Sequence, residues 1–364
     1  MPSAYPVLKV GTRGSPLALK QTQIVVEALR SVYPRTEVRV IPIRTSGDRI
    51  QDASVLRKAG KGLFAKEIEQ ALLRRKISLA VHSFKDLPSE QPDGLVIGAV
   101  LERKEAADGY IANSPVSLDK APPGTVVGTS SLRRQAQLRE FAPHVRVVEL
   151  KGNLDTRLEA LRSRRTKLQG IVVAAAGVLR LYPPNNGQAV RMELLCKDRF
   201  VPCPAQGALC VEVCEGNERL REMLRAIDHP QTAAAVSAER HLMRRLEGGC
   251  QIPLGVHARP ISDGMLQLLR VNAYLGLPDG KRSVRAEATG SLDDPVAVAE
   301  NLETLLRARG ASSLLEELSD RYRMGPGRLG LGVSAAKARR GSSARARKRT
   351  GHSRRAGRGR RAKR

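Results

Sequence analysis

Basic side chains gather in the turns that follow short apolar runs. Arg13 and Ser15 follow one such run, and Ser131, Arg133 and Arg134 follow another in a similar GT…S context. Each serine is placed to cap a helix, and helix N-termini attract anions while disfavouring cations. A bound anion would remove that conflict, and the planar fork of arginine suits carboxylates. The simpler alternative for an isolated Arg-Arg pair is that the side chains point into solvent or pair with a neighbouring carboxylate.

Further cations occupy comparable turns along the chain, at Lys61, Lys151, Arg157 and Arg180. The Gly-rich turn around Lys61 lacks the GxxxxGK[ST] pattern, so it is not a nucleotide-binding P-loop. Because cationic turns recur in both halves of the chain, we favour an anionic small-molecule ligand over isolated surface arginines.

The segment HSFKDLP (82–88) adds a carboxylate to this basic set. Asp86 lies beside Lys85 directly after an apolar run. A carboxylate among cations stays ionised unless it is desolvated, and it can stabilise a developing positive charge or shuttle a proton. The simpler alternative is an Asp that caps a turn before Pro88. We interpret His82 as a structural histidine.

The cysteine pattern indicates neither disulfides nor zinc. The five cysteines are odd in number and no pair has CxxC spacing, so we expect no disulfide framework and no metal site. Four of them are expected to be small, partly buried hydrophobes, namely Cys196, Cys203, Cys210 and Cys214. Cys250 differs, because two glycines precede it in GGCQIP (248–253) and leave its thiol accessible. On pattern alone, an incidental cysteine there is an equal alternative.

The charge is extreme and unevenly distributed. The 364 residues carry a net charge of +27, and residues 325–364 hold 15 Lys and Arg with no Asp or Glu, which leaves +12 on the rest. This tail has almost nothing to bury, so we expect it to be disordered. Aromatic residues make up 3%, which argues against a single-stranded nucleic-acid binder. No signal peptide or spanning apolar run is visible, so we expect a cytoplasmic protein without membrane contact.

Apolar periodicity predicts alternating strands and helices in the first half of the chain. Strands are expected at 7–10, 38–43, 77–81, 95–100, 125–128, 145–150, 171–175 and 206–214, and helices at 15–29, 63–75, 131–141 and 154–164. This alternation is typical of mainly parallel sheets covered on both faces. From residue 233 the pattern becomes helix 233–246, strands 252–258, 266–274 and 283–289, then helices 295–309 and 312–322. It indicates a small α+β domain after two α/β domains with a ligand between them.

In order and spacing, these segments resemble the porphobilinogen deaminase family from about Lys9 to Asp320. The matching stretches are GTRGSPLAL, TSGD (45–48), GKGLF (60–64), AVHSFKDLP, GTSSLRRQ, KGNLDTRL, AAAGVLRL (174–181), PAQGAL (204–209) and AERHLMRRLEGGCQIPLG (238–255). The resemblance implies two α/β domains like those of type II periplasmic binding proteins, flanking a cleft, and a small C-terminal α+β domain. We expect the first at 1–103 and 205–226, the second at 104–204 and the third, cofactor-carrying, at 227–324, with the basic tail at 325–364.

The resemblance also implies the activity of a transferase, hydroxymethylbilane synthase. Four porphobilinogen molecules are joined head to tail into hydroxymethylbilane with release of ammonia, in porphyrin and haem biosynthesis. The primer is a dipyrromethane cofactor bound covalently through a thioether to Cys250. Asp86 matches the catalytic carboxylate, and the other cofactor contacts implied are Lys85, Ser131, Arg133, Arg134, Asp48 and Lys61. The substrate contacts implied are Arg13, Ser15, Lys151, Arg157 and Arg180. A monomer without metal is expected.

Two features depart from the family pattern. The family carries Arg where this chain has Lys151, so a charge is kept but bidentate carboxylate binding is lost, and altered handling of intermediates is expected. The basic tail is not a family feature either. It is a solubilising extension or, alternatively, a nonspecific contact for nucleic acid. A non-catalytic solute-binding protein would share the two-domain cleft but would not need Cys250 in a third domain.

Overall fold

The computed structural model describes residues 7–49, 64–163, 165–184, 187, 189–246 and 252–322, with the side chains of Asp48, Arg49 and Tyr322 left out. All of these residues belong to one compact unit, Met1–Leu329. The sequence predictions for Lys61, Cys250 and the tail at 325–364 fall outside the described residues, and so does the side chain of Asp48.

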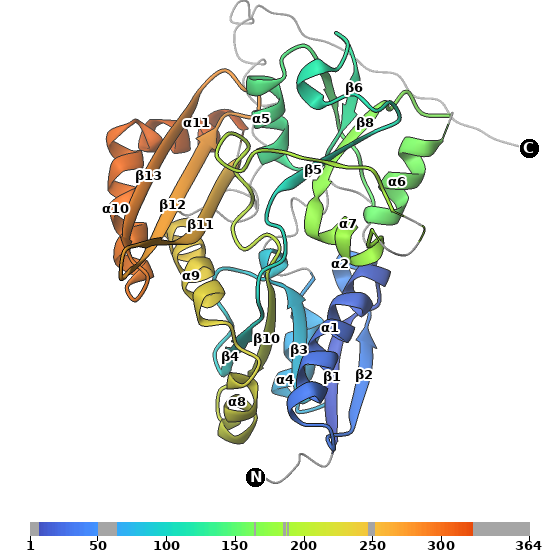
Figure 1. Cartoon of the computed structure of the whole chain (residues 1–364), viewed down its shortest axis with the longest axis vertical. Coiled ribbons are helices and arrows are strands. Elements are labelled where there is room, and N and C mark those ends of the chain that lie inside the picture. Colours follow the sequence, from blue (N-terminus) through green and yellow to red (C-terminus); the bar gives the residue numbers. More distant parts are fainter. Residues whose placement is uncertain are drawn as a thin grey trace, which may run out of the picture. The chain divides into compact units, whose positions relative to one another are not determined.

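The first sheet combines strands from two distant parts of the chain. Its members are β1 (Leu8–Arg13), β2 (Val38–Ile43), β3 (Leu79–Ser83), β4 (Leu95–Val100) and β10 (Leu209–Cys214). Their order is β2-β1-β3-β10-β4, and only β10 runs antiparallel to its neighbours (Figure 1). The predicted parallel sheet therefore contains one reversed strand. The chain reaches β10 after β9, the last strand of the second sheet, and not through a βαβ crossover from the first sheet. No crossover therefore fixes the direction of β10.

Helices cover both faces of this sheet. α1 (Pro16–Val32) and α8 (Glu218–Arg225) pack on the face of Leu79 and Val81, whereas α4 (Lys66–Leu73) packs on the face of Ala80. Side chains alternate between faces along a strand, which explains how β3 contributes to both cores. The first turn of α1 confirms its predicted start, with Ser15 at the N-cap and a proline at the first helical position.

The second sheet repeats this architecture. Its strands are β5 (Asp108–Ala112), β6 (Val126–Gly128), β7 (Arg146–Val148), β8 (Gly170–Ala174) and β9 (Glu193–Leu194), in the order β7-β6-β8-β5-β9. α5 (Leu132–Phe141) packs on one face, and α6 (Leu154–Arg162) and α7 (Ala175–Leu181) on the other. β5 is antiparallel to β8. The strand β5 was not predicted, because it starts with Asp and Gly, two residue types that are uncommon in strands.

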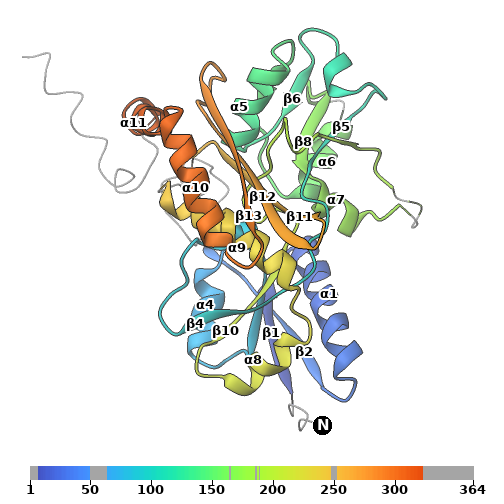
Figure 2. The same cartoon turned by 60° about the vertical axis from the view of Figure 1, so that its left-hand side comes forward.

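The third sheet is antiparallel and small. β11 (Leu254–Asp263), β12 (Leu266–Gly276) and β13 (Ser283–Ser291) pair in sequence order. α9 (Pro230–Arg245), α10 (Pro295–Ala308) and α11 (Ala311–Tyr322) share one hydrophobic core with it (Figure 2). The predicted fold class, two α/β domains and a small α+β domain, is confirmed. The exact domain boundaries remain predictions.

Candidate active site

The candidate site residues lie where strands of the first two sheets end. Arg13 is the last residue of β1 and Ser15 caps α1, while Lys85 and Asp86 lie in η1 (Phe84–Asp86), the single 3-10 turn after β3. In the second sheet, α5 follows β6, α6 follows β7 and α7 follows β8, and these carry the second set: Ser131, Arg133, Arg134, Lys151, Arg157 and Arg180. The carboxyl ends of parallel strands are the usual ligand-binding edge of an open α/β sheet.

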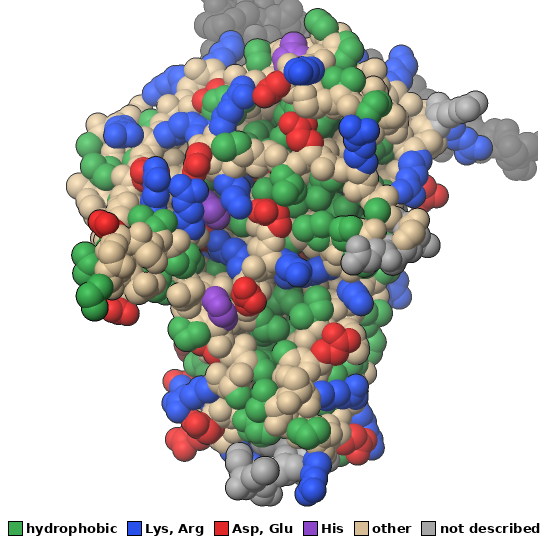
Figure 3. Space-filling model, in the orientation of Figure 1, with side chains coloured by type: hydrophobic (Ala, Val, Ile, Leu, Met, Phe, Trp, Pro, Cys, Tyr) green, Lys and Arg blue, Asp and Glu red, His purple; other side chains and the backbone are tan. Residues whose placement is uncertain are grey.

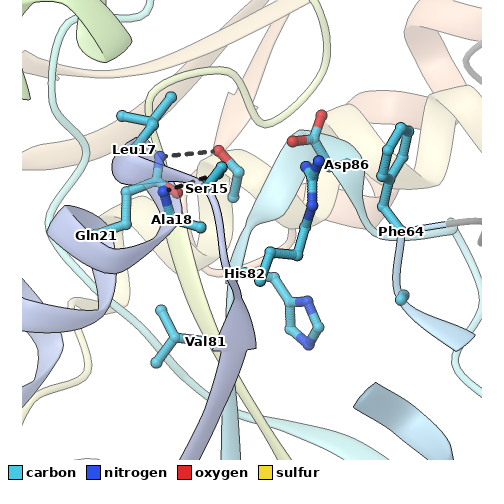
Figure 4. Close-up of a pocket in the computed structure, with 11 residues that line it drawn as sticks. Ser15, Leu17, Ala18, Gln21, Phe64, Val81, His82 and Asp86 are labelled. Atoms are coloured by element: carbon cyan, nitrogen blue, oxygen red, sulfur yellow. Dashed lines mark hydrogen bonds between the residues drawn. The ribbon is translucent and has the colours of Figure 1, made fainter. Parts of the chain in front are cut away.

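A pocket of about 450 Å³, part of it open to solvent, lies beside Asp86. Its lining residues are Arg13, Ser15, Leu17, Ala18, Gln21, Phe64, Ala65, Val81, His82, Ser83 and Asp86. Figure 4 shows the residues of α1 on one side of this pocket and Asp86 with Phe64 on the other. The Arg13 guanidinium lies 4.2 Å from the centre of the Phe64 ring. A cation and a carboxylate therefore line the same pocket, and the guanidinium of Arg13 stacks on an aromatic ring.

Both predicted helix caps are present. The Oγ of Ser15 accepts a hydrogen bond from the backbone N–H of Ala18 at 3.3 Å, and the Oγ of Ser131 accepts one from that of Arg134 at 3.4 Å. These serines satisfy free amides at the starts of α1 and α5. Each serine therefore stabilises the start of its own helix, and each lies at the edge of the site.

Arg133 and Arg134 have a negatively charged partner within the protein itself. Both are buried, and both pair with Asp108 at 2.7 Å. Burial by itself would raise the pKa of Asp108, but the two guanidinium groups hold it far below its usual range. The expectation that an anionic ligand resolves the cation conflict at α5 was thus incomplete. A neighbouring carboxylate, the simpler alternative, supplies one negative charge for two positive ones.

Gln206 connects this pair to the first sheet, and neither its residue type nor its spacing pointed to such a role. Its side-chain oxygen accepts hydrogen bonds from Arg134 Nη2 at 3.2 Å and from Lys85 Nζ at 3.4 Å. Its amide nitrogen donates to Asp108 at 2.9 Å and to the backbone oxygen of Ala106 at 2.8 Å. Its only sequence signal was membership of the PAQGAL stretch.

The cations around Asp86 influence one another. Burial lowers the pKa of Lys85, Asp86 raises it and Arg134 lowers it. Burial, followed by Arg134, lowers the pKa of Arg157 to about 10, and Asp86 acts in the opposite direction. Arg157 also donates to Ser130 Oγ at 2.9 Å. Lys85, Asp86, Arg134 and Arg157 therefore share one electrostatic neighbourhood, although they come from both sheets.

The two remaining predicted cations differ in their surroundings. Arg180 is buried, donates to the backbone oxygen of Gly207 at 2.8 Å, and has a pKa lowered by burial to about 10. Lys151 is exposed in the turn between β7 and α6. Arg180 thus contacts the segment that carries Gln206, while Lys151 stands at the solvent edge.

His82 anchors a buried polar cluster behind the pocket. Its Nε2 lies 3.2 Å from the carboxylate of Glu212, a residue fully buried on β10. Burial and then Glu212 raise the pKa of nearby Glu69, His82 lowers it, and the net result is a pKa of about 7. The hydrogen bond agrees with the interpretation of His82 as a structural histidine, although its ring also lines the pocket.

The cysteines need one correction. Cys210 is buried and Cys203 and Cys214 are partly buried, as expected, but Cys196 is exposed. It lies after the short edge strand β9, where no core covers it. Burial raises the pKa of Cys203, while Arg133, Lys85 and Arg134 lower it. Within the described residues, no group of His, Cys, Asp and Glu is arranged to hold a metal ion.

Comparison with known families gives the decisive observation. A family model described as "Porphobilinogen deaminase, dipyromethane cofactor binding domain" matches residues 8–222, and the C-terminal domain model of the same family matches 233–308. The chain belongs to the porphobilinogen deaminase family. The two matched regions include every strand of the three sheets.

Curated relatives named porphobilinogen deaminase match over most of their own length. The protein of Desulforudis audaxviator is 45% identical over 306 residues, which is 84% of this chain and 96% of the relative. That of Moorella thermoacetica is 43% identical over 311 residues, 85% and 96% of the two chains. That of Thermus thermophilus is 42% identical over 312 residues, 86% and 99%.

Among solved structures, the Methionine Binding Protein MetQ matches with a TM-score of 0.37 and 13% identity, over 64% of this chain and 96% of its own. A TM-score this low supports no conclusion about this chain. No helix in the described residues is both long and apolar enough to cross a membrane.

The described residues fit the family's cofactor. A dipyrromethane carries acetate and propionate groups, so it needs several cations in one place. The Nε atoms of Arg133, Arg157 and Arg180 are buried without a hydrogen-bond partner, and Asp108 leaves the Arg133–Arg134 pair with an excess positive charge. Buried cations with incomplete partners are the complement that a polycarboxylate requires.

Proposed function

We propose that this chain is a hydroxymethylbilane synthase that condenses four porphobilinogen molecules head to tail and releases ammonia. Membership of the porphobilinogen deaminase family establishes the enzyme class and the dipyrromethane-binding domain. The observation that carries the proposal for this chain is the exposed carboxylate of Asp86 within a group of cations drawn from both sheets.

The cations have a binding role in this proposal. Each pyrrole unit brings two carboxylates, and Lys85, Arg134 and Arg157 share the neighbourhood of Asp86. A bound carboxylate favours the charged form of a partly desolvated cation, so substrate binding offsets the burial that lowers the pKa of Arg157. Arg13 and Arg180 extend this surface on the sides of the first and second sheets, respectively. The proposed ligand is therefore a polyanion.

Asp86 has the opposite charge to the groups around it. When bound, the dipyrromethane would supply the free pyrrole carbon to which the first unit is added, and each later unit would add to the pyrrole before it. In our proposal, Asp86 accepts hydrogen bonds from pyrrole N–H groups and stabilises the positive charge left on the incoming unit as ammonia departs. Asp86→Asn keeps the size but removes the charge, so turnover is expected to fall by about a hundredfold or more.

The covalent anchor is the part of the proposal that rests on sequence alone. We propose that Cys250, which follows α9 by five residues, holds the cofactor through a thioether. Loss of ammonia from the aminomethyl group of a porphobilinogen unit breaks its C–N bond and leaves an electrophilic methylene carbon. The soft thiolate of Cys250 would add to this carbon, and the resulting C–S bond resists thiol exchange. We further propose a cytoplasmic monomer.

Intact mass spectrometry of the full-length protein tests the anchor. We expect a mass above that of the sequence by one dipyrromethane, a positive reaction with Ehrlich's reagent, and consumption of porphobilinogen. Cys250→Ser should lose the adduct, the colour and the turnover. Cys196→Ser is the matched control, because Cys196 is an exposed free cysteine away from the site, and it should keep all three. An unmodified wild-type protein that stays unmodified after incubation with porphobilinogen would refute the proposal.

A further inference from the structure

The short segment that carries Asp86 cannot fix its own position. η1 is a single 3-10 turn, and no side chain caps it. Such turns have poor internal hydrogen-bond geometry, and the backbone bond that closes this one, from Leu87 N–H to Phe84 O, is long at 3.3 Å. The place of the Asp86 carboxylate therefore depends on contacts from other elements.

Arg240 on α9 supplies such contacts on both sides of Asp86. Its Nη1 donates to the backbone oxygen of Leu87 at 3.1 Å, and its Nη2 donates to that of Pro88. The same guanidinium lies 4.4 Å from the centre of the Phe84 ring. Arg240 is buried. One planar side chain thus brackets the turn, which a lysine could not do with a single ammonium group.

Glu239, the preceding residue, holds a second part of the site. It is fully buried, and its carboxylate accepts hydrogen bonds from the backbone N–H of Ala205 at 2.6 Å and of Ala258 at 2.7 Å. Arg103 pairs with both of its oxygens, at 2.8 and 2.7 Å. This carboxylate therefore joins α9 to β11 and to the crossover before β10.

Ala205 is the residue through which Glu239 reaches the site. Its φ of 59° lies in the left-handed region, which costs an alanine about 1 kcal/mol and needs support from its surroundings. Gln206 follows directly and contacts both Lys85 and Arg134. Support of Ala205 by Glu239 thus sets where Gln206 meets the two cations.

We propose that Glu239 and Arg240 are positioning residues, by which α9 fixes the Asp86 turn and the Ala205–Gln206 crossover relative to each other. The inference rests on the proposed function, since it takes Asp86 as the catalytic carboxylate. Neither residue contacts the substrate in this proposal.

Arg240→Lys tests this in the purified holoenzyme. Lysine keeps the charge and can stack on Phe84, so the fold should survive, but it cannot hold both backbone oxygens. We expect kcat to fall by about tenfold to a hundredfold with KM nearly unchanged, since small displacements of a reacting group have effects of this size. The dipyrromethane adduct should still be present by mass. Arg244→Lys, an exposed position one turn further along α9, is the matched control and should leave kcat and KM unchanged.

Hydrogen exchange gives a second readout that does not depend on turnover. In Arg240→Lys, the amides of Phe84 and Leu87, which donate to Ala208 O and Phe84 O, should exchange at least several-fold faster than in the wild type. Glu239→Gln should speed exchange around residues 205–207 instead. Wild-type exchange at 84–87 in Arg240→Lys, or wild-type kcat, would overturn the inference. A wild-type enzyme that does not consume porphobilinogen would refute the proposed function and leave the exchange result to decide the positioning role.

Discussion

The carboxylate of Asp108 is the partner on which two buried guanidinium groups depend. Asp108→Asn would leave Arg133 and Arg134 with no negative charge at 2.7 Å. Breaking a buried ion pair by removing one partner typically costs about 3–5 kcal/mol of folding stability. We expect a loss of this size in urea unfolding.

Asp119→Asn provides the control for Asp108. Asp119 pairs with Arg199 at 3.2 Å, but both side chains are at least half exposed, and such pairs contribute about 1 kcal/mol or less. Equal losses in the two variants would show that the Asp108 pair is no more important than a surface ion pair.

The raised pKa of Glu69 makes the folding stability depend on pH. Burial, followed by Glu212, raises its pKa from 4.5 to about 7, so the folded protein holds this proton more tightly than the unfolded chain. Stability from this group is therefore present at low pH and is lost as the pH rises from 4.5 towards 7. Glu69→Gln should reduce the drop in Tm between pH 5 and pH 8. Glu159→Gln, an exposed change on α6, should leave the drop as it is; an unchanged drop in Glu69→Gln would contradict the prediction.

Residue types could be read from the sequence more easily than their partners. The recurrence of Arg and Lys after strands located the cations, because helix starts and strand ends are marked by Ser, Gly and Pro nearby. Asp108 gave no signal, since its meeting with Arg133 depends on the antiparallel register of β5 and β8. Gln206 was equally hidden, because only the fold brings the crossover between Lys85 and Arg134.

The crossover before β10 requires a glycine at 207. Gly207 has a φ of 89°, and a Cβ there would lie 2.8 Å from the backbone oxygens of Glu105 and Lys104. Backbone atoms cannot move aside easily, so Gly207→Ala should cost about 1–3 kcal/mol. It should also lower turnover, because the Gly207 oxygen accepts from Arg180.

Gly216→Ala is the control for this element, since nothing lies within 4 Å of the added Cβ. Thermal unfolding should show a lower Tm for the change at 207 and little change at 216. A Gly207→Ala protein as stable as the wild type would mean that the crossover shifts without cost.

Helices and strands with strong periodicity were predictable in their type and approximate place, as Ser15 at the start of α1 illustrates. The resemblance placed 205–226 in the first domain, but the position of β10 between β3 and β4 was not predictable, because an apolar run carries no information about which strands it will separate. The same holds for β5 and for the short helices α7 and α8, each too brief for a clear period.

The basic excess of the whole molecule has two components. Figure 3 shows Lys and Arg side chains spread over one face with Asp and Glu among them, whereas residues 325–364 carry 15 Lys and Arg and no acid. We therefore expect nonspecific binding to nucleic acid to come from the tail, since a concentrated run of cations releases the most counterions.

Deletion of residues 325–364 separates the two components. The shortened protein should elute from DNA-cellulose at a lower salt concentration. Its affinity for DNA should also decrease less steeply as salt is added. Consumption of porphobilinogen by the same preparation should not change. Undiminished retention would place the nucleic-acid contact on the body of the molecule.

β10 lies between β3 and β4 in the first sheet, although more than a hundred residues separate it from either in the sequence. During synthesis on the ribosome, β3 and β4 therefore emerge with facing edges that have no partner. Until about residue 214 leaves the exit tunnel, the nascent chain holds an incomplete sheet that can pair with other nascent chains. The second sheet, whose strands all lie within residues 108–194, can close first.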